Sequence, residues 1–215
     1  MTAILALWND CAPEALNHYE RWYAGEHLEE RVGVPGFRYG RRYEAIEADR
    51  RFFTYYEVDS PAVLSSQPYV DRLNAPTEWT RRAMASFRGT IRTVCDLTYT
   101  TGRMHGAYAV TLRLSKTVPA FDDSVLAEIA CQNGVARLQI WTAASAQTPP
   151  KTKELASRGG QDETAAGAII VECLRLADVE QISGDLIELA NARLGNNGAY
   201  ALGLYAFLCS QETNA

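Results

Sequence analysis

The order of strand-like and helix-like segments constrains the fold of this 215-residue chain more than any single motif does. Its first part is predicted to form a strand, a helix, two strands, a helix and a strand, at residues 2–9, 15–30, 37–46, 51–58, 77–87 and 90–101. The second part repeats that order without obvious sequence identity, at 106–114, 119–133, 135–144, 168–176, 178–195 and 200–208. The pattern predicts two domains, 1–102 and 103–215, each a ferredoxin-like β-α-β-β-α-β unit.

The strands also indicate how the two units meet. Residues 52–58 and 200–208 carry apolar or aromatic side chains on both alternating faces, so each four-stranded antiparallel sheet needs cover on the face away from its helices. Packing the two sheets against each other provides that cover. We therefore predict an α+β fold in which two tandem ferredoxin-like units, packed sheet to sheet, form an α/β barrel within one chain. Because this removes the apolar face that would drive dimerisation, a homo-oligomer is left open but not required.

One segment lacks the pattern of either element. Residues 147–164, QTPPKTKELASRGGQDET, have the proline, glycine and charge content of an exposed, mobile connection. The segment is longer than most loops.

Composition argues against several classes of function. The net charge of -5 and the pI near 5.3 are unlike the basic surface of a nucleic-acid binder. The five cysteines are widely spaced and form no CxxC pair, so we interpret them as buried thiols, with a reactive thiol as the alternative. The sequence has neither a signal-like start nor a run of about 18 apolar residues, which predicts a soluble cytoplasmic protein with no membrane partner.

The stretch WYAGEHLEERVGVPGFRYGRRY, from Trp22 to Tyr43, joins an apolar helix face to ionisable groups. At about 100° per residue, one stripe of the helix holds Ala15, Leu16, Tyr19, Trp22, Tyr23, Glu26, His27 and Glu30. Valine, proline and glycine at 34–36 then end the helix. The polar end of the stripe is therefore expected at the rim of whatever the helix covers.

Four short motifs resemble those of a known family: W-Y-x-x-E-H-L-x-E-R at 22–31, P-G-F at 35–37, R-R-Y at 41–43 and N-x-P-T-x-W-T-R-R at 74–82. Together they resemble the dimeric α/β-barrel superfamily, and within it the EthD-like group, over about the first hundred residues. The resemblance implies a barrel of two ferredoxin-like units, here fused in tandem, with a pocket between sheet and helices. Members of the superfamily include cofactor-free monooxygenases, polyketide cyclases, dehydratases and isomerases, and others bind heme.

His27 is the first candidate for catalysis, because an imidazole exchanges protons near neutral pH and Glu26 or Glu30 could orient it. The alternative is that His27 hydrogen-bonds the turn before Pro35. Glu26 is the second candidate, as a base at the end of the aromatic stripe. Its alternative is an ion pair with one of the nearby arginines, Arg31, Arg41 or Arg42.

Substrate binding is predicted for an aromatic set with hydroxyl donors, together with one arginine: Tyr19, Trp22, Tyr23, Arg42, Tyr43, Tyr55 and Trp79. We expect two or three of the six aromatic residues to reach a cavity and the others to belong to the core. Arg42 would bind an anionic or carbonyl group, or else be a surface arginine.

No cofactor is predicted. The only histidines are His18, His27 and His105, and one Glu-His-Glu cluster is not a full ligand set for a metal. By the resemblance, fused heme-binding relatives place an axial histidine in the C-terminal half, where this chain has His105 alone.

The predicted function is that of a cofactor-independent enzyme acting by proton transfer on a small aromatic or polyketide-like compound, as a lyase, isomerase or monooxygenase. The alternatives are a non-catalytic protein, either small-ligand-binding or structural, and a heme-binding relative. The helix at 119–133 has no histidine, and its apolar stripe ends without the acidic pair of the first helix, so any polar site is expected to be confined to the first half and the chain to have one pocket.

Overall fold

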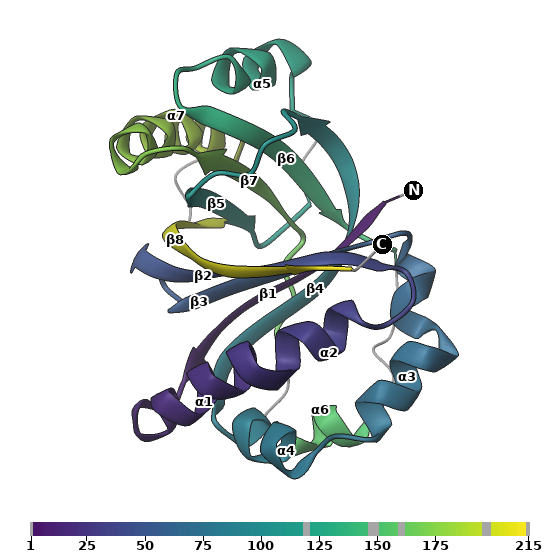
Figure 1. Cartoon of the computed structure of the whole chain (residues 1–215). Helices are drawn as coiled ribbons and strands as arrows, with labels where there is room; N and C mark the ends of the chain where they lie inside the picture. The colour runs from purple at the N-terminus through teal and green to yellow at the C-terminus, as the bar shows by residue number, and fades with distance from the viewer. Residues whose placement is uncertain (1, 118–120, 146–150, 159–161, 195–198, 214–215) are drawn as a thin grey trace.

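Eight antiparallel strands form a closed barrel in the computed structural model, which describes residues 2–117, 121–145, 151–158, 162–194 and 199–213 (Figure 1). The strands are β1 Ala3–Cys11, β2 Phe37–Glu47, β3 Phe52–Val58, β4 Phe87–Thr101, β5 Tyr108–Leu114, β6 Val135–Ala143, β7 Gly167–Cys173 and β8 Tyr200–Glu212. Their order around the barrel is β1-β3-β2-β8-β5-β7-β6-β4. The two halves of the chain are thus joined by two pairings, β2 with β8 and β4 with β6. The expected α+β barrel is present, closed by hydrogen bonds into one continuous sheet.

Helices cover the outside of the barrel on two sides. Those of the first half are α1 Leu16–Trp22, α2 Leu28–Val32, α3 Gln67–Asn74 and α4 Glu78–Ala85, with short turns η1 Pro13–Ala15, η2 Tyr23–His27 and η3 Pro61–Ser65. Those of the second half are α5 Asp123–Ala130, α6 Lys153–Ser157 and α7 Leu176–Leu194. In Figure 1, α5 and α7 lie on the opposite side of the strands from α1 to α4. The α6 helix, although it belongs to the second half, lies beside α3 and α4.

The barrel interior is filled by side chains of alternate strand positions. Its core is largely aromatic and contains Trp8, Tyr43, Phe53, Tyr55, Trp141 and Tyr205, all at most 1% exposed. On β1 the intervening residues, Leu5 and Leu7, pack outward against the helices. Both faces of the sheet are therefore buried, as the strand composition predicts.

A register shift interrupts the alternation of side chains along β4. Alternation places Tyr99 on the same side as Ile91 and Cys95, but the pairing of β4 with β6 shifts between Leu97 and Tyr99. A one-residue shift reverses the facing of the side chains that follow. Tyr99 accordingly packs in the core beneath the second-half helices instead of in the barrel.

The segment 147–164 was predicted to be an exposed, mobile connection, and residues 147–150 and 159–161 lie outside the described residues. Of the described ones, Lys151, Lys153, Ala156, Glu163 and Thr164 are exposed as predicted, but the segment also contains a short helix and two buried side chains. Residues 153–157 form α6, and the side chains of Thr152 and Glu154 are buried. Thr152 caps the helix by accepting a hydrogen bond from the Leu155 backbone N–H at 3.3 Å. A single helical turn is too short to show an apolar periodicity, so the sequence pattern gave no sign of it.

The thiols are less uniformly buried than predicted. Cys95 and Cys173 are buried, Cys11 and Cys209 are half-buried, and Cys131 is exposed at the end of α5.

Candidate functional site

A cavity of about 510 Å³ lies between the outer face of the sheet and the helices of the first half. The sheet contributes Leu5 and Leu7 of β1, Tyr56 of β3 and Arg92 of β4. Strand pairing explains this grouping, since Leu5 lies opposite Tyr56 and Leu7 lies opposite Arg92. The volume suits a small-molecule ligand.

Helices close the other sides of the cavity. His27 and Arg31 come from η2 and α2, and Tyr69 and Leu73 come from α3. The remaining wall comes from the second half of the chain, with Thr152, Glu154, Leu155, Arg158, Asp162 and Thr164. Two predictions are thereby corrected: the cavity is not confined to the first half, and the segment after β6 is part of its wall.

Strand pairing also explains how the second half reaches this cavity. Because β6 pairs with β4, the chain leaves β6 beside the first half of the sheet. It returns along β4, where the backbone N–H of Arg92 donates to the carbonyl of Glu163 at 2.9 Å. Between these points α6 is tied to α3 by a hydrogen bond from the Lys153 N–H to Asn74, at 3.2 Å.

His27 is the imidazole of the cavity. It is the last residue of the π-helical turn Tyr23–His27 and is 4% exposed. Its ring stacks on Trp22 with 4.0 Å between ring centroids and meets the edge of Tyr23 at 5.0 Å. The Nδ1 atom is buried and has no hydrogen-bond partner among the described residues. Single π turns of this kind are frequent at functional sites.

The surroundings of His27 favour its neutral form. Burial lowers the pKa of His27 well below its usual value, and the positive charges of Arg31, Arg158 and Arg42 lower it further. The ring is therefore an uncharged imidazole at neutral pH, with one nitrogen able to accept a proton.

Neither carboxylate predicted to orient His27 contacts it. Glu26 instead accepts hydrogen bonds from the hydroxyls of Thr77 and Thr80, at 2.7 and 2.8 Å, where α4 begins. Glu30 pairs with Arg72 at 3.4 Å and with Arg31 at 3.9 Å. The physical reason is the π turn, because it alters the 100° spacing on which the predicted stripe depends.

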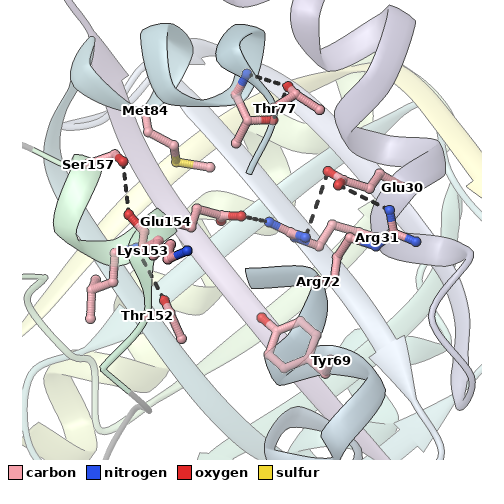
Figure 2. A network of polar contacts seen from close by, with 12 residues as sticks. Glu30, Arg31, Tyr69, Arg72, Thr77, Met84, Thr152, Lys153, Glu154 and Ser157 are labelled. Carbon is pink, nitrogen blue, oxygen red and sulfur yellow. Dashed lines mark hydrogen bonds and ion pairs between the residues drawn. The ribbon is translucent and has the colours of Figure 1, made fainter. Parts of the chain in front are cut away.

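Arg31 is the most buried cation of the cavity, at 3% exposure. Figure 2 shows it between Glu30 and Glu154, and its Nη2 forms an ion pair with the nearly buried Glu154 of α6. Its Nη1 atom is buried without a hydrogen-bond partner among the described residues. Arg31 therefore holds α6 in place, and its Nη1 donors make no hydrogen bond to a described residue, since Glu30 is 3.9 Å away.

Two side chains of the sheet also have hydrogen-bond donors with no partner, or only one partner, among the described residues. The hydroxyl of Tyr56, a residue 1% exposed, has no partner among the described residues, and burial raises the pKa of Tyr56 well above its usual value. Arg92 is half-buried and donates to the Tyr69 hydroxyl at 3.3 Å. Both were missed by sequence analysis, although alternation with the inward-facing Tyr55 and Ile91 would have placed them on the outer face.

Only His27 of the nine predicted site residues lines this cavity. Arg42 is buried and binds Glu20 through two hydrogen bonds of 2.8 Å, with its guanidinium 4.3 Å from the Tyr23 ring centroid. It is therefore neither a ligand of this cavity nor a surface arginine.

The predicted aromatic set divides between two cores and one half-exposed position. Tyr19, Trp22 and Tyr23 pack between the helices and the sheet, and Tyr43 and Tyr55 fill the barrel. Trp79 is half-exposed and lies against Gly25. None of the six lines the 510 Å³ cavity, in place of the two or three expected.

A second cavity of about 300 Å³ lies in the other half, between α5 and the sheet. Its wall includes Thr98, Phe121, Leu126, Ile140 and Trp141, and no histidine of the described residues contributes to it. The expectation of one pocket per chain is therefore wrong. The cavity with ionisable groups suited to proton transfer is the one at His27.

Comparisons with known proteins identify the fold. No protein-family model and no curated protein matches the chain. Its structure is similar to that of an anthrone oxidase-like protein, with a TM-score of 0.63 at 10% identity over 100% of this chain and 94% of the other. It is also similar to a protein of Lactobacillus acidophilus provisionally described as a monooxygenase, with a TM-score of 0.55 at 7% identity over 99% and 97%.

A third similar structure is a heme-binding protein from Thermus thermophilus, with a TM-score of 0.50 at 10% identity over 97% of this chain and 91% of the other. The first two proteins belong to the dimeric α/β-barrel superfamily. At these identities the likeness shows that this chain has the α/β-barrel fold. None of the helices in the described ranges is long and apolar enough to cross a membrane.

Proposed function

We propose that the chain is a cofactor-independent enzyme that acts by proton transfer on a small aromatic or polyketide-like compound, with His27 as the base. The observation that carries the proposal is a neutral imidazole in the wall of a ligand-sized cavity, with a buried nitrogen left without a partner among the described residues. Buried polar atoms normally have partners, and exceptions point to a role for the vacant bond.

The same proposal places the chain in the EthD-like group as a fused tandem of ferredoxin-like units, 1–102 and 103–215. The strand order supports it, since β4-β1-β3-β2 in the first half corresponds to β8-β5-β7-β6 in the second. In a fused tandem, the second unit of the same chain contributes α6 to the wall of the cavity.

In the proposed reaction, His27 removes a proton from an acidic C–H or O–H group of the substrate. The C–H or O–H bond breaks, an N–H bond forms on the imidazole, and the electron pair stays on the substrate as an enolate or phenolate. The unused donors of Arg31 and Tyr56 are available to stabilise that negative oxygen. Because a low pKa makes His27 a weak base, the substrate proton must be acidic, as it is beside carbonyl groups or on a fused aromatic ketone. Whether the enolate then eliminates, isomerises or reacts with O₂ depends on the substrate.

Glu26 has a different part in the proposal. Through Thr77 and Thr80 it ties the π turn to the start of α4, and Thr80 in turn accepts a hydrogen bond from Trp22, on which His27 stacks. We assign Glu26 as a positioning residue for the imidazole.

The test begins with mass spectrometry of small molecules that co-purify with the protein, followed by assays of anthrones and polyketide-like enols for product mass and O₂ uptake. His27→Gln is expected to lower kcat/KM by about 10²–10⁴-fold, the usual range for a general base. Its melting temperature should change by less than about 4 °C, the shift that corresponds to about 1 kcal/mol. His18→Gln is the matched control, because His18 packs against Trp79 outside the cavity.

Two results would contradict the proposal. Equal turnover by wild type and His27→Gln would exclude His27 as the base, and bound ligand without any turnover would favour a non-catalytic binding protein. In the heme alternative, His27 is the histidine available as an axial ligand in the 510 Å³ cavity. A Soret band in the purified protein that disappears in His27→Gln would establish the heme alternative.

A further inference from the structure

The charges around the His27 cavity do not cancel. Arg31 is paired with Glu154, and Arg158 is paired with Asp162 at 2.7 Å. Glu30, which does not line the cavity, lies 3.9 Å from Arg31 and is shared with Arg72 at 3.4 Å. Arg92 forms no ion pair with any carboxylate of the described residues, and its side chain donates one hydrogen bond, to Tyr69. With His27 neutral, the described part of the cavity wall therefore carries one uncompensated positive charge.

Tyr69 brings the unused donors together. Its hydroxyl accepts from Arg92 at 3.3 Å, and its ring centroid lies 6.0 Å from the guanidinium carbon of Arg31. Tyr56 belongs to the same group, since it lines the cavity with these three residues and has a buried hydroxyl without a described partner. Two guanidinium groups and a phenol hydroxyl thus border one cavity, and all can donate to the same kind of group.

The apolar part of the cavity lies beside this group of donors. Leu5 and Leu7 are neighbours of Tyr56 and Arg92 across the strands, and Leu73 follows Tyr69 by one turn of α3. A ligand that satisfies both parts has a flat or branched apolar body and an oxygen-rich, negatively charged end.

We propose that the substrate is a monoanion at neutral pH, an aromatic or polyketide-like carboxylate, and that Arg92 determines this specificity by binding the carboxylate, while Arg31 and Tyr56 remain for the oxygen that becomes charged in the reaction. This inference rests on the proposed function in that it concerns the same cavity. It adds a fixed anionic group on the substrate, separate from the oxygen that becomes charged when His27 removes a proton. A carboxylate compensates the charge of Arg92, whereas a neutral ligand leaves it unpaired in a partly desolvated site.

The test compares two probes that differ only in this charge, 6-hydroxy-2-naphthoate and 6-hydroxy-2-naphthamide, by isothermal titration calorimetry of the full chain at pH 7.5. The acid is expected to bind about tenfold more tightly than the amide, since a charge-assisted bond to a guanidinium replaces a neutral one. In Arg92→Gln the ratio should fall to about one, and in Arg92→Lys it should be intermediate.

Arg82→Gln is the matched control, because Arg82 is an exposed arginine of α4 paired with Glu78, and it should keep the wild-type ratio. Circular dichroism and the melting temperature show whether each variant is folded. The wild-type ratio and its decrease at high NaCl test the proposal even if an Arg92 variant does not fold.

Equal affinities for acid and amide in the wild type, including a lack of measurable binding of either, would overturn the proposal. An equal loss of both affinities in Arg92→Gln would do the same, because it would mean that Arg92 contributes shape and not charge. The binding ratio needs no turnover, so its outcome is separate from that of the proposed reaction. A lost acid preference in Arg92→Gln with full turnover in His27→Gln would support the anion site and reject proton transfer by His27.

Discussion

At the scale of single residues, the sequence correctly pointed to His27 as a residue of the cavity but did not predict which side chains surround it. The aromatic stripe pointed to His27 because it follows Trp22 and Tyr23 on the helix. The stripe could not show that Tyr23–His27 is a π turn, which turns Glu26 toward Thr77 and leaves the imidazole beside arginines. The resulting base is neutral and unassisted by a carboxylate among the described residues.

The low pKa of His27 predicts how stability depends on pH. Below about pH 6.5 the unfolded chain binds a proton at this position that the folded chain does not bind. The free energy of unfolding should therefore decrease as the pH falls, by at most about 1.4 kcal/mol per pH unit. His27→Gln removes this term, so its loss of stability between pH 7.5 and 5.5 should be smaller than that of the wild type by about 1 kcal/mol. Urea denaturation at the two pH values measures both losses, and identical losses would contradict a buried neutral His27.

At the scale of elements, α6 is what sequence analysis missed. Its sequence is polar, its helix is one turn long, and its position depends on the distant pairing of β4 with β6. Local periodicity contains none of this information. The barrel strands were easier to predict from the sequence, because their apolar pattern is local and both of their faces are buried.

The ion pair between Arg31 and Glu154 should be essential to the position of α6. Replacing Glu154 with Gln leaves the buried Arg31 with only the more distant Glu30, which we expect to cost about 3 kcal/mol. The double variant Arg31→Met, Glu154→Leu removes both charges and should recover most of that loss. Chemical denaturation of the single and double variants measures the coupling.

The exposed pair of Arg82 and Glu78 is the control for this cycle. It has the same chemistry on the surface of α4, where Glu78→Gln should change the free energy of unfolding by less than about 0.5 kcal/mol. A similarly small effect for Glu154→Gln would show that α6 does not depend on Arg31.

At the scale of the whole molecule, the barrel and a pocket between its sheet and helices were predictable, and the residues that line the pocket were not. The order of elements, repeated in both halves, anticipated eight strands with two buried faces. The lining depends on contacts between residues far apart in the chain, such as Arg31 with Glu154. It also depends on which face of the sheet the side chains of Arg92 and Tyr56 occupy. Alternation places Tyr56 and Arg92 on the outer face, but a bulge can reverse the facing of later residues, as it does at Tyr99. Strand patterns also contain no information about the walls that the helices contribute.

Both halves of the chain enclose the neutral imidazole of His27. Burial lowers the pKa of His27, and the charges of Arg31 and Arg42 from the first half and of Arg158 from the second lower it further. Imidazole ¹⁵N chemical shifts in the full-length protein, assigned among three histidines with His→Gln variants, measure that pKa directly. We predict that the His27 signals stay those of a neutral ring from pH 8 to below about pH 6 and move when 6-hydroxy-2-naphthoate is added. Titration of His27 at or above its usual pKa of about 6.5, with no response to ligand, would contradict the account.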